Sequence, residues 1–190
     1  MSKIAIYGGT FDPPTFAHLL IIEQIQKNMD FDEFYIIPCN LPNNDKINIT
    51  NNADRYNMLK IALSDHPNVK IDDRELKRGT ISYTIDTLKS FDYENNELFL
   101  IMGDDEFNSF ENWKNFEEIA NIARIVCIIS RDTPSIDMLN KYNPYIYELN
   151  PKTLISSSLI RNMISKGESV KYLLPDKVIE YIKKRNLYTK

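Results

Sequence analysis

Short apolar runs recur along the chain and alternate with stretches in which apolar residues repeat at helical spacing. The runs are rich in β-branched and aromatic residues. Several are apolar on both faces, which is typical of strands in a parallel sheet that is covered on both sides. The predicted strands are Ile4–Tyr7, Phe34–Ile37, Val69–Ile71, Leu98–Met102, Arg124–Ile129 and Pro144–Leu149.

Apolar residues at helical spacing predict helices between and after these strands. The helices are marked by His18, Ile22, Ile25 and Met29; by Leu59, Ala62 and Leu63; by Ile81, Ile85 and Leu88; and by Val178, Tyr181 and Ile182. Pro175 and Asp176 supply a start signal for the last helix.

Strands and helices in alternation predict an α/β fold with a doubly wound parallel sheet, Rossmann-like, whose crossovers are right-handed. In such sheets, ligands bind beyond the carboxyl ends of the strands, where the strand order reverses. The chain has 190 residues. This length suits a single domain over residues 1–190, with C-terminal helices from about residue 157 onward.

Hydrophobic residues make up 43% of the chain and charged residues 26%, values that are typical of globular domains and argue against disorder. The segment Asn40–Asn52 differs, because it is rich in Asn and Pro and has little apolar content. We predict a long mobile loop there, after the second strand, in a position where loops often carry function.

The net charge of −4 gives no general case for binding nucleic acid or membranes, so an anionic ligand requires positive charge gathered locally. Cys39 and Cys127 show neither zinc-ligand spacing nor a disulfide framework, which predicts a reducing compartment. The N-terminus leads directly into a strand pattern without an export segment. No apolar run approaches the roughly 20 residues that span a bilayer. We expect a cytoplasmic protein, and the sequence leaves open whether it forms a homo-oligomer.

The first candidate for chemistry is the segment Tyr7–His18, between the first strand and the first helix. Gly8 and Gly9 let the backbone turn tightly and approach a ligand closely, and N–H groups at the helix start can hold a phosphate. Thr15 and His18 have the spacing that places both on one helix face, which predicts a hydroxyl and an imidazole at a phosphate pocket. The alternative is a plain turn into a helix with a half-buried histidine. It is disfavoured because all these features meet at one strand end.

The second candidate is the segment Ile155–Arg161, which opens another helix. Ser156, Ser157 and Ser158 can cap the helix and still offer hydroxyl and N–H groups to an anion. Arg161 follows one turn later, and its guanidinium fork suits phosphate oxygens. Taken alone, this segment would be interpreted as a serine cap followed by a solvated arginine.

Together the two segments resemble the adenylyltransferases of the nucleotidyltransferase superfamily. The family pattern Gly-x-Phe-x-Pro-x-(His/Thr)-x-x-His stands here as Gly9 to His18, and an Ile-Ser-Ser-Thr-x-x-Arg-like pattern stands as Ile155 to Arg161. The resemblance to the bacterial nicotinate-nucleotide adenylyltransferases runs from residue 3 to residue 188. It includes Ile37-Pro38 through Asn40 to Lys46, Asp72–Arg78, Ser82–Leu88, Gly103–Asp105 with Trp113, and the ending from Tyr172 to Tyr188.

The resemblance implies a role for each matching residue. His18, Thr15 and Arg161 would be the catalytic residues that hold the ATP phosphates. The other residues of the ATP and phosphate site would be Gly8, Gly9, Thr10, Phe11, Asp105, Ser156, Ser157 and Ser158. Those of the mononucleotide site would be Asn40, Lys46, Tyr83, Thr84 and Trp113, the last three at the pyridine ring.

The implied reaction is adenylyl transfer from ATP to nicotinate mononucleotide, which gives nicotinate adenine dinucleotide and pyrophosphate in NAD synthesis. The 5′-phosphate attacks the α-phosphorus directly, so positioning and charge neutralisation supply the catalysis without a protein nucleophile. Mg²⁺ is expected to arrive with ATP, since the sequence shows no dedicated carboxylate cage for a metal.

Two alternatives stay open. The chain could adenylate nicotinamide mononucleotide or pantetheine phosphate instead, or it could be a non-catalytic nucleotide-binding sensor on the same fold. The joint presence of Thr15, His18 and Arg161 argues against a sensor. Two departures from the family pattern stand out: Ala17 replaces the usual Gly, and Asp45 precedes Lys46 where a basic residue is common.

Overall fold

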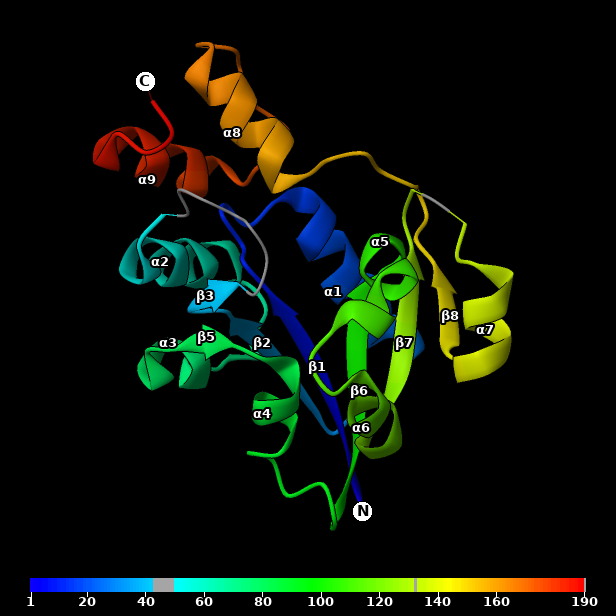
Figure 1. The fold of residues 1–190 in the computed structure, drawn as a ribbon. Coiled ribbons are helices and arrows are strands. Elements are labelled where there is room, and N and C mark those ends of the chain that lie inside the picture. The colour runs from blue at the N-terminus through cyan, green and yellow to red at the C-terminus, as the bar shows by residue number, and fades with distance from the viewer. Residues whose placement is uncertain (43–49, 132, 190) are drawn as a thin grey trace.

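The computed structural model describes residues 1–42, 50–131 and 133–189, and its centre is a six-stranded parallel sheet in the order β4-β2-β1-β6-β7-β8 (Figure 1). The strands are β1 (Ser2–Gly9), β2 (Glu33–Pro38), β4 (Val69–Ile71), β6 (Asn96–Gly103), β7 (Ala123–Ile129) and β8 (Tyr145–Glu148). Each of the predicted strands is confirmed, with small differences at the ends. The predicted α/β class and doubly wound topology are confirmed as well.

The strand order reverses beside β1. From β1 the chain moves outward to β2 and β4, and it then returns to pair β6 with the other side of β1 before continuing to β7 and β8. The carboxyl ends of β1 and β6, at Gly9 and Gly103, therefore flank the switch point where ligands bind in such sheets.

Apolar cores cover both faces of the sheet because successive strand residues point to opposite sides. Ile4 and Ile6 of β1 belong to one buried cluster, together with residues of the later helices. Ala5 and Tyr7 belong to the other, which includes Ile22 of the first helix. This explains why the strand sequences are apolar throughout.

The helices connect these strands and close the carboxyl end of the sheet. They are α1 (Phe16–Asn28), α2 (Asn52–Ala62), α3 (Arg74–Arg78), α4 (Thr84–Leu88), α5 (Asp104–Asn108), α6 (Phe116–Ile122), α7 (Ile136–Tyr142), α8 (Ser157–Ser165) and α9 (Asp176–Arg185), with a 3₁₀ turn η1 at Phe110–Asn112. Figure 1 shows α8 and α9 at the end of the sheet away from the N-terminus. No helix of the described residues is long and apolar enough to cross a membrane.

One predicted helix is wrong in its first turn. Ile81 lies in a two-residue strand, β5 (Ile81–Ser82), which pairs with β3 (Leu41–Pro42) in a second small sheet. The helix begins only at Thr84, because Tyr83 is extended, with φ −109° and ψ 128°. The spacing of Ile81 matched a helix by coincidence, since this side chain is 42% exposed.

The predicted loop Asn40–Asn52 is only partly covered by the described residues. Leu41–Pro42 form β3, and Asn52 already begins α2. Residues 43–49, with Lys46 among them, lie outside the described residues, so the mobility of this segment and the role of Lys46 stay predictions.

The C-terminal helices pack on α2 through a third apolar cluster that includes Met58, Ile160, Val178 and Ile182. Asp54 of α2 adds a polar clamp, because its carboxylate accepts from the Tyr181 hydroxyl at 2.7 Å and from Arg185 Nε at 3.0 Å. Both partners lie on α9. This packing brings α8 to the loop that follows β1.

Candidate active site

The loop after β1 is shaped by two glycines with different surroundings. A Cβ on Gly8 would meet nothing within 4 Å, so this residue borders open space. A Cβ on Gly9 would lie 3.0 Å from the ring of Phe11. Phe11 adopts a left-handed conformation with φ 49° and is 2% exposed. The Phe11 ring therefore packs over Gly9, and only glycine leaves room for it.

The ring of His18 is held by the start of its own helix. The backbone N–H of Thr15 donates to His18 Nδ1 at 2.9 Å, and the Thr15 hydroxyl lies 2.9 Å from the same nitrogen. The Phe11 ring packs edge-on against the imidazole, with 5.1 Å between the centroids. Because Nδ1 accepts a hydrogen bond from an N–H group, the proton of the neutral ring sits on Nε2.

The structure places two other residues of this loop against His18. Thr15 is fully buried and its hydroxyl contacts His18. The Phe11 ring is buried between Gly9 and His18. The roles expected for Thr15 at a phosphate and for Phe11 at the nucleotides stay predictions.

The second segment meets the first one directly. Ser157 Oγ donates to the Pro13 carbonyl at 2.8 Å, and Arg161 Nη1 donates to the Asp12 carbonyl at 2.8 Å. Arg161 Nη2 also donates to Ser158 Oγ at 3.1 Å. The fold thus joins the start of α8 to the loop between β1 and α1.

Ser156 has a capping role in this arrangement. Its Oγ accepts from the Leu159 N–H at 3.2 Å, which satisfies one of the donors at the start of α8. Ser158 is exposed at the same helix start, beside the guanidinium of Arg161. A helix start that carries hydroxyl groups and an arginine fork is suited to a phosphate.

Buried charged residues below the loop were missed by the sequence reasoning. Arg55 is fully buried, and it donates to the carbonyls of Thr10 at 2.9 Å, Thr50 at 3.0 Å and Asn40 at 3.1 Å. A signal was present, because Arg55 lies on the apolar stripe of its helix, three residues before Met58. A cation at such a position must find acceptors inside the protein.

Asp12 is the second buried charge. Its carboxylate accepts from the Thr50 N–H at 3.0 Å and from the Tyr188 hydroxyl at 2.6 Å, and it is 1% exposed. Burial first, and then the nearby charge of Asp12, raise the pKa of Tyr188. The C-terminal tail is therefore tied to the loop after β1.

A cavity of about 350 Å³ opens beside this loop, between the ends of β1 and β6 and the segments around α4 and η1. Its wall includes Glu75, Glu106 and Lys114, which the sequence reasoning did not select. The sequence-predicted residues that the structure brings together in its wall are Gly8, Gly9, Thr10, Tyr83, Thr84 and Trp113. Trp113 is half-buried and packs edge-on against Phe110, with 5.8 Å between the ring centroids.

Asn40 and Asp105 lie outside this cavity wall. The Asn40 side chain donates to the Thr80 carbonyl at 2.8 Å and accepts from Asn52, so its amide joins protein segments. Asp105 is exposed, and its Oδ1 accepts from the Glu106 N–H at 3.0 Å. Asp104, its neighbour, is instead 1% exposed and accepts from the backbone N–H of Arg131 at 2.7 Å, which joins the carboxyl ends of β6 and β7.

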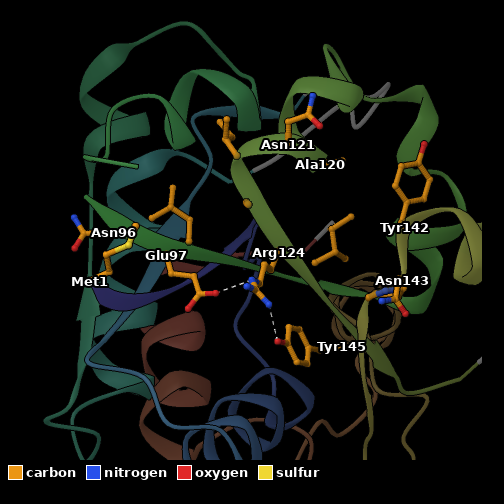
Figure 2. Close-up of a pocket in the computed structure, with 14 residues that line it drawn as sticks. Met1, Asn96, Glu97, Ala120, Asn121, Arg124, Tyr142, Asn143 and Tyr145 are labelled. Carbon is orange, nitrogen blue, oxygen red and sulfur yellow. Dashed lines mark hydrogen bonds and ion pairs between the residues drawn. The ribbon is translucent and has the colours of Figure 1, made fainter. Parts of the chain in front are cut away.

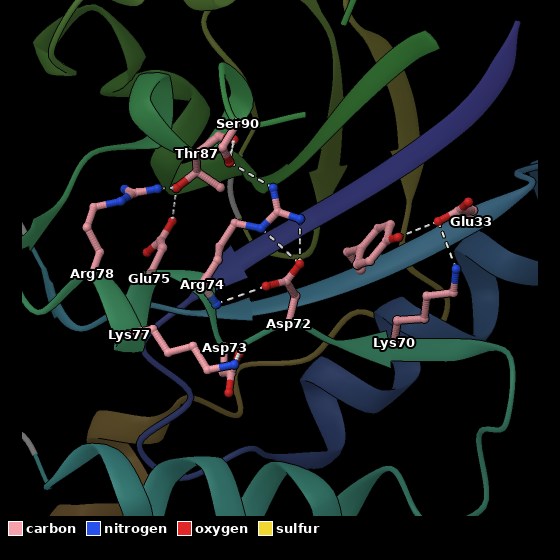
Figure 3. A network of polar contacts seen from close by, with 11 residues as sticks. Glu33, Lys70, Asp72, Asp73, Arg74, Glu75, Lys77, Arg78, Thr87 and Ser90 are labelled. Carbon is pink, nitrogen blue, oxygen red and sulfur yellow. Dashed lines mark hydrogen bonds and ion pairs between the residues drawn. The ribbon is translucent and has the colours of Figure 1, made fainter. Parts of the chain in front are cut away.

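Glu75 lies buried in the cavity wall, and Figure 3 shows its side chain pointing toward Thr87 beside Arg78. The Thr87 hydroxyl donates to Glu75 Oε1 at 2.5 Å. Burial raises the pKa of the Glu75 carboxyl, and the hydrogen bonds from Thr87 and Ser82 oppose this shift only in part. Burial in the cavity wall thus makes this carboxyl easier to protonate than an exposed one.

A larger hollow of about 770 Å³ lies at the opposite end of the sheet (Figure 2). It is lined by the amino ends of β6, β7 and β8, where Arg124 pairs with Glu97 at 2.6 Å and donates to the Tyr145 hydroxyl at 2.9 Å. No sequence-predicted site residue lines it. Because parallel sheets bind ligands at the carboxyl ends of their strands, we assign the site to the smaller cavity.

The fold and the site together define a nucleotide-binding α/β protein, and comparisons with known proteins identify its class. The model of the cytidylyltransferase-like family matches residues 6–163. A probable nicotinate-nucleotide adenylyltransferase of Borreliella afzelii is 38% identical over 191 residues, which covers 99% of this chain and 97% of that protein. Another, of Oceanobacillus iheyensis, is 33% identical over 190 residues, with 99% and 97% covered.

A solved structure agrees with these relatives. The nicotinic acid mononucleotide adenylyltransferase of Plasmodium falciparum in complex with NaAD superposes with a TM-score of 0.85 at 25% identity, covering 99% of this chain and 98% of that chain. The chain therefore belongs to the cytidylyltransferase-like family and, within it, to the nicotinate-nucleotide adenylyltransferases.

Proposed function

We propose that this protein joins nicotinate mononucleotide to the AMP part of ATP and releases pyrophosphate, as a step of NAD synthesis. One observation carries this proposal above the others: His18 on α1 and Arg161 on α8 both contact the segment between β1 and α1, next to a cavity lined by Tyr83 and Trp113. The names of the relatives and of the similar solved structure support the same reaction.

The reaction is a direct displacement. An oxygen of the mononucleotide 5′-phosphate forms a bond to the α-phosphorus of ATP, while the bond from that phosphorus to the pyrophosphate oxygen breaks. Two polyanions must be held in line, so orientation and charge neutralisation provide the rate enhancement. No side chain needs to form a covalent intermediate.

His18 and Arg161 are the residues that would neutralise the moving charge. The neutral His18 ring donates through Nε2–H, because Nδ1 is occupied by the Thr15 N–H. Arg161 presents a planar fork at the start of α8, where the helix dipole also favours an anion. Both groups are oriented before the substrate enters, which is the condition for electrostatic catalysis.

The mononucleotide is proposed to place its pyridine ring in the cavity beside Tyr83 and Trp113, with Thr84 at the ring substituent. Gly8, where an added Cβ would meet nothing within 4 Å, leaves space for its ribose and phosphate next to the backbone. We expect the acid form to be preferred over the amide, because N–H donors near Thr84 would match a carboxylate, whereas the amide presents a donor of its own.

Mg²⁺ is proposed to enter with ATP, where it would neutralise part of the phosphate charge. Among the described residues, no three His, Cys, Asp or Glu side chains gather as a metal-binding group. We also propose that the protein works in the cytoplasm, in line with its two buried cysteine thiols.

The test is a pyrophosphate-release assay with ATP and, side by side, nicotinate mononucleotide, nicotinamide mononucleotide and pantetheine phosphate. We expect the highest kcat/KM with nicotinate mononucleotide. Release with pantetheine phosphate alone would assign a different adenylyltransferase. Binding of ATP without release of pyrophosphate from any acceptor would indicate a sensor.

A further inference from the structure

Lys114 occupies a distinct place in the cavity wall, directly after Trp113. Its Nζ lies over the ring of Tyr83, 4.0 Å from the centroid. An ammonium group over an aromatic face at this distance is attracted to the ring while it keeps its charge. Two segments that are far apart in sequence thus place a cation and two aromatic rings together at the pyridine end of the cavity.

The charge of Lys114 is not matched by a protein carboxylate in the described part of the chain. The nearby acidic residues Glu111 and Glu118 already pair with other lysines, Lys141 and Lys89, each at 2.5 Å. Lys114 takes part in none of the ion pairs between described residues.

The other charged residues of the cavity wall also bear on the position of Lys114. Among the described lining residues, Lys114 is the one cation, and the acidic groups are Glu75 and Glu106. Glu75 is 7% exposed and hydrogen-bonded to Thr87, and burial raises the pKa of its carboxyl. An anionic group that enters beside Tyr83 therefore meets the positive charge of Lys114.

We propose that Lys114 strengthens the preference for the acid mononucleotide beyond the N–H donors near Thr84, because its ammonium group, held over the Tyr83 ring, binds the carboxylate on the pyridine ring. The inference rests on the proposed function and adds a specificity residue to it. The amide mononucleotide has the same ring and the same phosphate but no charge at this substituent, so it gains much less from Lys114.

The test uses Lys114→Gln and Lys114→Arg, with Lys60→Gln as a matched control. Lys60 is also an exposed lysine over a tyrosine ring, with its Nζ 5.7 Å from the Tyr56 centroid, but it lies on α2 outside the cavity wall. For each protein, kcat/KM is measured with nicotinate mononucleotide and with nicotinamide mononucleotide. The quantity that decides is the ratio of the two values.

We expect Lys114→Gln to lower this ratio by about 10- to 100-fold, the loss typical of a hydrogen bond to a charged group, mainly through a higher KM for the acid. Lys114→Arg keeps the charge and should retain most of the ratio, and Lys60→Gln should leave it unchanged. An unchanged ratio in folded Lys114→Gln overturns the inference. An equal loss of kcat/KM with both mononucleotides also overturns the inference, because it would mean that Lys114 only supports Tyr83.

Binding provides a second readout that does not depend on turnover. Trp113 is the single tryptophan of the chain, so its fluorescence reports occupation of the cavity. Titration with each mononucleotide should show that Lys114→Gln weakens binding of the acid selectively. If the wild-type protein releases no pyrophosphate with nicotinate mononucleotide, the proposed function fails. If the wild-type protein releases pyrophosphate with a strong preference for the acid, and Lys114→Gln retains this preference, only this inference fails.

Discussion

The backbone N–H of Thr15 donates to Nδ1 of His18 across 2.9 Å, and this contact decides which nitrogen of the imidazole carries the proton. An N–H group cannot accept, so Nδ1 must present its lone pair, and the neutral ring must be protonated at Nε2. The Thr15 hydroxyl lies 2.9 Å from the same nitrogen. The first turn of α1 thus fixes both the tautomer and the orientation of the proposed catalytic donor.

Replacement of His18 should affect catalysis far more than folding. We expect His18→Ala to lower kcat by about 10²–10³, the usual loss when one preorganised donor to developing charge is removed. Circular dichroism provides the folding control. A folded variant with kcat close to that of the wild-type protein would remove His18 from the mechanism.

Thr15→Val tests whether Thr15 acts through His18. The variant keeps the backbone N–H but loses the hydroxyl contact, so kcat should fall less than in His18→Ala, and stability should fall by about 1 kcal/mol. If Thr15 only positions His18, the double variant that combines Thr15→Val with His18→Ala should have the kcat of His18→Ala alone. Losses that add fully in the double variant would instead give Thr15 its own contact with the phosphates.

Arg161→Lys should not behave as a conservative substitution. Lysine keeps the charge but loses the planar fork that reaches both the Asp12 carbonyl and Ser158. We expect kcat/KM for ATP to fall by at least about tenfold, as for the loss of a charge-assisted hydrogen bond, with little change in the melting temperature. Arg185→Lys, at the clamp between α9 and Asp54, is the control and should leave turnover unchanged. Loss of stability without loss of turnover in Arg161→Lys would make Arg161 a structural residue.

The two glycines after β1 should respond differently to alanine. In Gly8→Ala the added methyl group enters open space in the cavity wall, so KM should rise while the protein stays stable. In Gly9→Ala the methyl group would lie 3.0 Å from the Phe11 ring, which packs against His18, so kcat should fall. Steady-state kinetics and thermal melts of both variants check this contrast. Identical kinetic profiles would contradict it.

Glu75→Gln should change how stability depends on pH. Burial raises the pKa of Glu75 in the folded protein above its ordinary value, so the folded state binds more protons than the unfolded state between these two values. The contribution of Glu75 to the stability of the folded protein is therefore most favourable below the ordinary pKa of the carboxyl. This contribution is lost as the pH rises through the folded-state pKa. Glutamine does not titrate. The stability of Glu75→Gln relative to the wild-type protein should thus increase from acid to neutral pH in urea unfolding, and parallel curves would exclude this account.

The local pattern of the chain was sufficient for the strands of the main sheet and for the starts of α1 and α8 at the two candidate segments. Strand positions follow from apolar runs, and helix starts such as Ser156 and Asp176 follow from capping signals that extend over one turn. These features depend on neighbours within a few residues. The same local reasoning failed at Ile81, where helical spacing was outweighed by pairing with Leu41 in the small second sheet.

Roles that depend on distant partners became visible only in the tertiary structure. The Thr15 hydroxyl and the Phe11 ring both contact the imidazole of His18, and no periodicity in the sequence encodes these contacts. Arg55 stabilises the loop after β1 because the docking of α2 brings carbonyls to its guanidinium. The chain returns through β6 to the other side of β1, and the segments that follow β6 bring Lys114 to Tyr83. Short-range spacing specifies an element and its exposed face, whereas the packing of elements far apart in the chain selects which side chains meet, and with them the chemistry of the site.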